Sequence, residues 1–128
     1  MSGNLPYVKS FRTLTSYKYA INLADEIFHA SLKFPKEETY SLTDQIRRSS
    51  RSIGAQIAEA WGKRRYIKHF ISKVTDAYAE TYETEHWLLM AYRCGYIDIE
   101  EFNNLLGICN QLSQLIGGMI SKADRFCT

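Results

Sequence analysis

The sequence has few of the residues that interrupt regular secondary structure. Two prolines and seven glycines in 128 residues leave little material for long loops. No run of 18 apolar residues occurs, so we expect no membrane-spanning helix. The N-terminal MSGNLPYVKSF lacks the apolar core of a signal peptide, which predicts a protein that is not exported. At this length we expect a single domain over residues 1–128.

Cysteine is also scarce. Cys94, Cys109 and Cys127 are odd in number and lack metal-ligand spacing, so neither a disulfide framework nor a zinc site is expected. Cys94 and Cys109 lie in apolar helical sequence, where a free cysteine acts as a small hydrophobic residue. Free thiols suit a reducing compartment, so we expect a cytoplasmic protein.

The apolar residues recur with the period of amphipathic helices. They predict four helices, at about residues 15–33, 41–63, 68–94 and 99–125. Because the predicted connections are short, consecutive helices are expected to run antiparallel. The predicted fold is therefore an all-α, antiparallel, up-down-up-down four-helix bundle.

Several residues mark the expected ends of these helices. Pro35 ends the first, because the residue before a proline is pushed out of helical geometry. Ser41 and Asp44 match a capping box at the start of the second. Gly95 suits the end of the third, where a positive φ costs glycine little. Asp98 can cap the start of the fourth.

Two E-x-x-H motifs raise the question of a metal centre. Glu26 with His29, and Glu83 with His86, have the spacing of ligand pairs in di-iron carboxylate bundles. At 100° per residue both glutamates point away from the expected core. We therefore expect no metal site and no cofactor.

The third helix is expected to turn a carboxylate toward the core. Its apolar stripe is taken to include three tyrosines, Tyr78, Tyr82 and Tyr92. On that reference Glu85 points into the bundle, and a buried carboxylate must be paired. Arg47 or Arg48 is the natural partner, with Lys18 as an alternative. The sequence thus predicts a buried ion pair at Glu85.

Signatures of common catalytic sites are absent. The sequence contains no P-loop, no G-x-G-x-x-G, no G-x-S-x-G and no H-E-x-x-H. Glu85 could act as an acid or base with a shifted pKa, but no nucleophile or second carboxylate lies in phase with it. We therefore expect no enzymatic activity.

Charge is distributed unevenly along the chain. Residues 70–101 carry two basic and seven acidic side chains. Residues 45–69 carry a single acid, Glu59, and seven basic residues: Arg47, Arg48, Arg51, Lys63, Arg64, Arg65 and Lys68. Such asymmetry indicates either contact with nucleic acid or complementary pairing of helices.

On a helical wheel the second helix has a face opposite its apolar side where arginine alternates with small residues. The members of that face are Arg47, Arg48, Arg51, Ala55, Ala58, Gly62 and Arg65. Solvated faces more often mix lysine and glutamate at i,i+4 spacing. Small residues allow a second subunit to approach closely, and guanidinium geometry suits phosphate. Solvent, subunit interface and phosphate contact all stay open for this face.

Residues 42–65, LTDQIRRSSRSIGAQIAEAWGKRR, resemble the signature of a bacterial four-helix-bundle family encoded by intervening sequences within large-subunit ribosomal RNA genes. The matching positions are Leu42, Gln45, Ile46, Arg47, Arg48, Ile53, Ile57, Ala58 and Glu59. The KFPKEE and GYI segments resemble the first loop of the family and the turn after its third helix. Gly54, Gln56 and Ala60 depart from the family pattern, which has proline, asparagine and glycine there.

The resemblance implies a homo-oligomeric ring, commonly a pentamer with a central channel. The family includes the accessory variability determinant of diversity-generating retroelements, which binds nucleic acid and works with a reverse transcriptase. RNA or DNA and a reverse transcriptase are therefore expected partners. Arg47, Arg48 and Arg51 would serve the interface or channel, and four residues would contact phosphates: Lys63, Arg64, Arg65 and Lys68. The alternative is an assembly module without nucleic-acid binding of its own.

Overall fold

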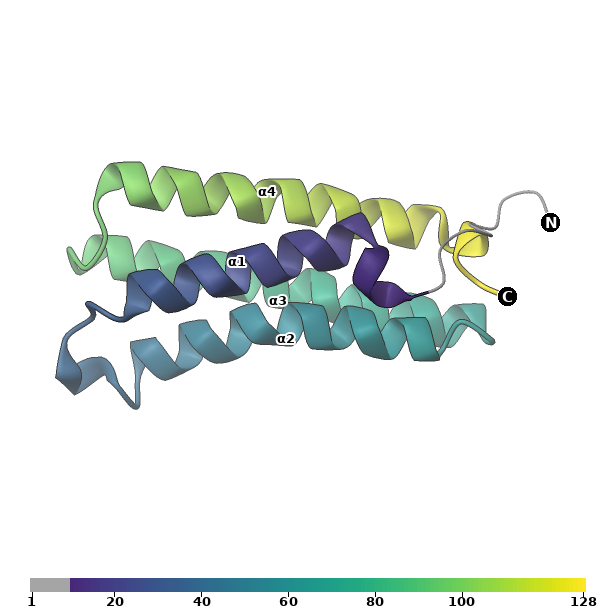
Figure 1. Ribbon diagram of the computed structural model, residues 1–128, viewed down its shortest axis with the longest axis horizontal. Helices are drawn as coiled ribbons and strands as arrows, with labels where there is room; N and C mark the ends of the chain where they lie inside the picture. The colour runs from purple at the N-terminus through teal and green to yellow at the C-terminus, as the bar shows by residue number, and fades with distance from the viewer. Residues whose placement is uncertain (1–9) are drawn as a thin grey trace.

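The computed structural model describes residues 10–128, which form four long antiparallel helices (Figure 1). Residues 1–9, which carry most of the segment tested for a signal peptide, lie outside this part. The long helices are α1 (Thr15–Ser31), α2 (Leu42–Gly62), α3 (Ile67–Arg93) and α4 (Ile99–Ser121). Short 3-10 helices are η1 (Phe11–Thr13), η2 (Lys36–Glu38) and η3 (Ala123–Arg125). The predicted all-α four-helix bundle is confirmed, although α4 ends at Ser121 and not near residue 125.

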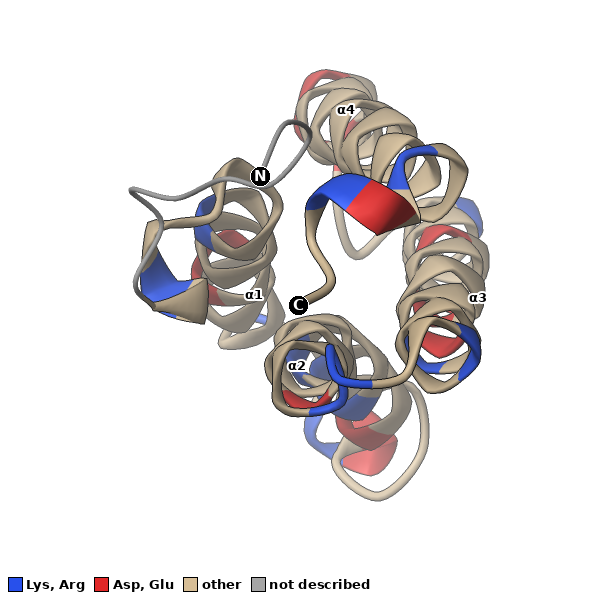
Figure 2. Ribbon diagram, turned by 90° about the vertical axis from the view of Figure 1, so that its right-hand side faces the viewer, with Lys and Arg blue, Asp and Glu red and all other residues tan. Residues whose placement is uncertain are grey.

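Each helix packs against the next along the chain, and α4 closes the bundle against α1 (Figure 2). The core consists mainly of aliphatic side chains, with Phe70, Cys109 and Met119, and buried serine or threonine residues complete the spacing on α2 and α3. Its largest fully buried members include Leu23, Ile27, Ile46, Ile53, Ile57, Phe70, Val74, Leu88, Leu105, Leu112 and Ile116. Burying one such side chain contributes about 1.5–3 kcal/mol, so this central stripe is the main source of stability.

The start of α2 is capped by Glu38 and not by the predicted capping box. Ser41 occupies the N-cap position, but its side chain makes no capping hydrogen bond, and its φ of −126° and ψ of −107° are not the extended cap conformation. The backbone N–H of Leu42 instead donates to Oε1 of Glu38 at 3.3 Å. Oε2 of the same carboxylate accepts from the Tyr96 hydroxyl at 2.8 Å. Because η2 folds back under the first turn of α2, Glu38 reaches the N–H that Ser41 does not.

The predicted caps at the α3–α4 connection are confirmed. Gly95 has a φ of +78°, and its N–H donates to the carbonyl of Tyr92 at 2.9 Å. The N–H of Tyr96 donates to the carbonyl of Ala91 at 2.9 Å, which completes a Schellman motif. Oδ1 of Asp98 accepts from the backbone N–H of Glu101 at 2.8 Å. The connection is therefore short and closed by local hydrogen bonds.

The predicted core face of α3 was wrong. Tyr82 and Tyr92 are exposed, and Tyr78 is half-buried. The buried residues of α3 are Phe70, Val74, Ala77, Thr81, Thr84, Leu88 and Ala91. Thr81 and Thr84 can face the core because each hydroxyl donates to the carbonyl four residues before it, at 2.9 Å. Their small side chains let α3 approach its neighbours, and the tyrosines stand outside.

The three cysteines have different environments. Cys109 is buried in the core, and burial, with Glu85 as a second cause, raises the pKa of its thiol to about 12. Cys94 is exposed, because it caps the C-terminus of α3, so the expectation of an apolar environment for it was wrong. Cys127 is half-buried.

Candidate nucleic-acid interface

Four of the seven predicted basic residues lie in or beside the tight turn between α2 and α3. Lys63 caps α2, with its N–H donating to the carbonyl of Ala60 at 2.9 Å. Tyr66 is the N-cap of α3, and its N–H donates to the carbonyl of Lys63 at 3.1 Å. Lys63, Arg65 and Lys68 are exposed, and Arg64 is half-buried. The turn therefore presents several cations within one short segment.

Aromatic rings lie against the arginines of this turn. The guanidinium of Arg64 lies 3.6 Å from the centroid of the Trp61 ring, and its Nε donates to the carbonyl of Trp61 at 2.8 Å. The guanidinium of Arg65 lies 5.7 Å from the centroid of Tyr66. Contacts of this kind contribute about 0.5–1 kcal/mol each at exposed sites. Arg64 is thus held against α2, while Arg65 lies toward the start of α3.

The C-terminal segment brings two more cations to the same end of the bundle. Phe126 stacks on Phe70 with centroids 5.9 Å apart, and the N–H of Thr128 donates to the carbonyl of Arg64 at 3.3 Å. Figure 2 looks onto this end, where η3 lies against α3 and α4 and the C-terminal tail extends toward α2. We call this group of six basic residues the basic end: Lys63, Arg64, Arg65, Lys68, Lys122 and Arg125. Asp124 is the only acidic residue in segments 60–70 and 121–128.

The opposite end of the bundle has the reverse charge. It holds the connections 32–41 and 94–101, with five carboxylates and two lysines. Lys33 pairs with Glu101 at 2.6 Å, which neutralises part of that charge. We call this the acidic end. Charge is therefore separated along the long axis of the molecule.

The other three predicted arginines do not join the basic end. Arg47 lies 16 residues before Lys63 on one helix, which corresponds to about 24 Å along the helix axis. Its Nε donates to Oγ of Ser31 at 2.7 Å, and its guanidinium lies 4.8 Å from the centroid of Phe28. Arg51 lies 5.7 Å from the same ring. Arg47 is therefore tied to α1, and Arg51 lies against the same ring.

Arg48 lies beside acidic residues of α3. Arg48 and Arg51 line a polar cavity of about 480 Å³ together with Glu80 and Glu83. Burial and the neighbouring charge of Glu83 raise the pKa of Glu80, while the positive charge of Arg48 opposes that rise. The charge of Arg48 is thus partly balanced within the chain.

The predicted buried ion pair at Glu85 was wrong. Glu85 is half-buried. The ion pairs within residues 10–128 join Lys33 to Glu101 and Lys73 to both Glu59 and Asp76. Because the core direction of α3 passes through Thr81 and Thr84 and not through Tyr78, Glu85 sits beside the core and has no need of a buried partner.

No group of three or more His, Cys, Asp or Glu side chains in the described part of the chain could hold a metal ion. Glu26, from the first E-x-x-H motif, accepts hydrogen bonds from Asn22 at 3.1 Å and from Asn104 at 3.3 Å. Glu83, from the second, accepts from Nε1 of Trp87 at 3.4 Å. Both glutamates are therefore engaged in local polar contacts.

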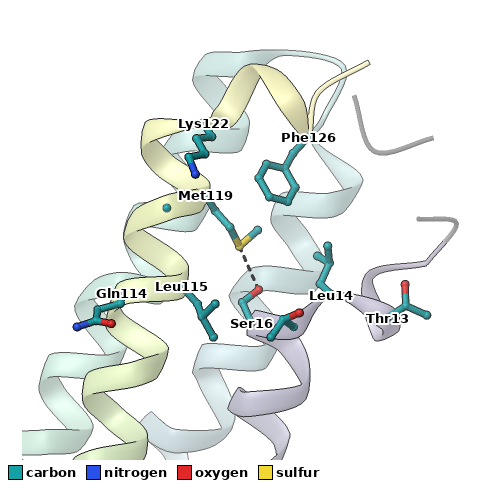
Figure 3. A pocket seen from close by; sticks show the side chains of 10 residues that line it. Thr13, Leu14, Ser16, Gln114, Leu115, Met119, Lys122 and Phe126 are labelled. Carbon is teal, nitrogen blue, oxygen red and sulfur yellow. Dashed lines mark hydrogen bonds between the residues drawn. The ribbon is translucent and has the colours of Figure 1, made fainter. Parts of the chain in front are cut away.

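A cavity of about 650 Å³ lies between α1 and α4 (Figure 3). Apolar side chains form much of its wall: Leu14, Leu115, Met119 and Phe126. The hydroxyl of Ser16 donates to the sulfur of Met119 at 3.1 Å across the two helices. Lys122 is the one charged residue in the lining. The cavity therefore lacks the paired acid and base that general acid–base catalysis requires.

The sequence pattern did not identify Lys122, Arg125 and Tyr66 as members of the candidate interface. An available signal was the predicted topology, because in an antiparallel bundle the residues after α4 lie at the same end as the α2–α3 turn. Tyr66 stands between two pairs of basic residues in RRYIKH, but its exposure depends on how the turn closes.

In residues 10–128 no helix is both long and apolar enough to cross a membrane.

The fold and the charged ends define a small four-helix bundle with opposite charge at its two ends. The model of the 23S rRNA-intervening sequence protein family matches residues 12–118, and the chain belongs to that family. The family resemblance inferred from residues 42–65 is thus confirmed.

The chain resembles a solved structure in both fold and sequence. That structure is of a protein of unknown function from the S23 ribosomal protein family of Bacteroides thetaiotaomicron. The two are 28% identical with a TM-score of 0.75, over 83% of this chain and 98% of that chain. No curated protein matches the chain.

Proposed function

We propose that this protein is a non-enzymatic, RNA-associated bundle that works as a homo-oligomer, with a pentameric ring as the expected form. The observation that carries the proposal is the basic end, whose segments 60–70 and 121–128 carry six Lys and Arg residues and one carboxylate. The family name, which refers to 23S rRNA, fits a nucleic-acid partner. DNA is a further possible ligand of the same surface, since phosphates are common to both.

The chemistry of the basic end suits phosphate groups. The arginine fork binds phosphate oxygens through two parallel hydrogen bonds, and lysine adds a mobile point charge. Each phosphate that is neutralised releases condensed counterions, so binding should weaken as salt rises. Because Lys63, Arg65 and Lys68 are exposed and in no ion pair within residues 10–128, they are ready for such contacts.

The test is to replace Lys63, Arg64, Arg65 and Lys68 with glutamine and measure RNA affinity over a series of salt concentrations. The expected result is weaker binding and a salt slope reduced by up to about 3, since each single-strand phosphate contact contributes about 0.7. Fluorescence anisotropy with a labelled RNA supplies the measurement.

A matched pair of double variants provides the control. Lys63→Gln with Arg65→Gln removes two exposed cations from the basic end. Lys36→Gln with Arg93→Gln removes two exposed cations elsewhere on the molecule. Only the first pair should weaken RNA binding. Unchanged affinity in the four-fold variant, or equal losses in the two double variants, would contradict the proposal.

A second candidate function is an assembly module that binds a protein partner, either further copies of itself or a reverse transcriptase. The observation that favours it is an apolar stripe on the outer side of α3, formed by Tyr82, Leu89 and Tyr92. These side chains are 49%, 41% and 36% exposed. Glu85 falls within the same stripe and has no ion-pair partner among residues 10–128. Aromatic side chains are enriched at protein–protein interfaces, so the stripe suits a partner surface that also offers a cation to Glu85.

A further inference from the structure

We infer that the basic end takes single-stranded and not double-stranded nucleic acid, with the ring of Tyr66 as a stacking platform for one base. This inference rests on the proposed function, because it names the class of nucleic acid that the same surface would hold. The inference is supported by the position of one exposed aromatic ring, that of Tyr66, among the cations of the α2–α3 turn.

Tyr66 is exposed in the turn between α2 and α3. Its side chain is 56% exposed, and it stands at the N-cap of α3 between the pairs Arg64-Arg65 and Lys68-His69. The imidazole of His69 lies 5.4 Å from its ring centroid at an interplanar angle of 55°. Arg65 precedes Tyr66 in the sequence and His69 follows it, and the side chains of both lie near the ring, which does not enter the core.

The other aromatic ring of this turn is less available. Trp61 is half-buried, and the guanidinium of Arg64 lies 3.6 Å from its ring centroid. A base could reach that ring only by displacing Arg64, whose Nε also holds the carbonyl of Trp61. Tyr66 is therefore the ring that an incoming base would meet, with the exposed side chain of Ile67 beside it.

An exposed ring favours single strands for a physical reason. Stacking of a base on an aromatic side chain contributes about 1–3 kcal/mol and tolerates any sequence, because every base has a flat face. In a duplex those faces are covered by neighbouring base pairs, and exposing one costs a few kcal/mol. A duplex can therefore use the phosphate contacts of the basic end but not the ring of Tyr66.

The chain contains an internal comparison for this inference. Tyr40 is 95% exposed and lies at the acidic end, three residues after Glu37. Residues 36–44 around it carry three carboxylates and one lysine, so phosphate is not drawn to this tyrosine. If exposure alone were enough, both tyrosines would contact nucleic acid. The inference assigns that role to Tyr66 alone.

The experiment compares a mixed-sequence RNA of about 12 nucleotides, within the usual range of single-strand site sizes, with a duplex of the same length. Anisotropy titrations at physiological salt use the full chain and three variants, Tyr66→Ala, Tyr66→Phe and Tyr40→Ala. We expect the wild type to bind the single strand more tightly. Tyr66→Ala should weaken single-strand binding roughly 5- to 150-fold, which corresponds to the loss of one stacked base. Duplex binding should stay unchanged.

The controls separate this inference from the proposed function. Tyr66→Phe keeps the ring and should retain single-strand binding, whereas Tyr40→Ala should match the wild type. If Tyr66→Ala binds the single strand as tightly as the wild type, or loses equally on both probes, single-strand stacking is wrong while phosphate binding stands. If the wild type binds neither probe, the proposed function fails and this inference falls with it.

Discussion

At the scale of single residues, Cys109 shows how burial alone changes the behaviour of a group. The core holds its thiol away from water, which raises its pKa from about 9 to about 12. In the unfolded chain the thiol ionises at its ordinary pKa. Between these two values the folded state therefore keeps a proton that the unfolded state has lost, and unfolding becomes more favourable as pH rises.

We predict that the free energy of unfolding falls between pH 9 and 12, by at most about 4 kcal/mol from this thiol, since one pKa unit corresponds to 1.36 kcal/mol. Urea unfolding at several alkaline pH values measures the slope. The Cys109→Ala variant should show a shallower slope, although some slope should persist. Tyr96 acts in the same direction, because its hydrogen bond to Glu38 raises its pKa to about 12. Equal slopes in the two proteins would contradict the assignment.

Residue-level predictions from the sequence succeeded where the deciding atoms are close in the chain. The caps at Gly95 and Asp98 depend on backbone groups three to five residues away, so local spacing was enough. The cap at Ser41 failed although Glu38 is only four residues from Leu42, because the conformation of the η2 loop, and not sequence spacing, decides between the two acceptors. Only the folded loop shows which of the two oxygens reaches the N–H of Leu42.

At the scale of elements, the start of α2 depends on Glu38. We predict that Glu38→Ala lowers stability by about 1–2 kcal/mol, because it removes the acceptor for Leu42 N–H and for the Tyr96 hydroxyl. Ser41→Ala should change stability by less than about 0.5 kcal/mol, as exposed positions without such contacts usually do. Urea midpoints of the two variants give the comparison. If Ser41→Ala lowered stability more than Glu38→Ala does, Ser41 would be the effective cap of α2 and this prediction would be wrong.

The helix α3 shows why a hydrophobic pattern can point in the wrong direction. Its tyrosines are large and partly apolar, so a count of apolar residues assigns the core face to the side of the helix that carries them. The structure places smaller residues there, and Oγ1 of Thr84 also lies within hydrogen-bonding distance, 3.0 Å, of Oγ of Ser49 on α2. A threonine hydroxyl that has hydrogen-bond partners can be buried in the core, and the sequence alone does not show those hydrogen bonds. Because the predicted core direction of α3 was wrong, Glu85 was also wrongly predicted to point into the core and form a buried ion pair.

The helix α2 was easier to predict, because large aliphatic residues alone mark its core face. Ile46, Ile53 and Ile57 are all fully buried, as the period of the sequence indicates. Gly54, where the family pattern has proline, lies inside a continuous helix and close to α1. A Cβ at this position would lie 3.4 Å from Cε1 of Tyr17. The departure from the family pattern thus leaves α2 unbroken.

At the scale of the whole molecule, the topology decides which charges lie together. The sequence grouped seven basic residues because they are close in the chain. The bundle places the first three about 18–24 Å before Lys63 along α2 and adds Lys122 and Arg125 from the far end of the chain. Sequence proximity therefore predicted the centre of the basic end, and the antiparallel order determines its extent.

The apolar stripe on α3 leads to a prediction about assembly. We expect Leu89→Arg to reduce the molar mass measured by light scattering, because it places a charge in the proposed interface. Ser72→Arg, at an exposed position on another side of α3, should leave the mass unchanged. Circular dichroism checks that both variants stay helical. A wild type that is monomeric at all accessible concentrations, or an assembly that Leu89→Arg leaves intact, would rule out this interface.

The separation of charge between the two ends also affects how the molecule approaches a partner. The helix α2 spans about 30 Å, several times the screening length of about 8 Å at physiological ionic strength. Each end then acts as an independent pole, and a polyanion meets the attraction of the basic end with little opposition from the other. In dilute salt the two poles are felt together, and the resulting torque turns the protein so that its basic end leads during encounter. Orientation before contact is thus a property of the bundle as a whole.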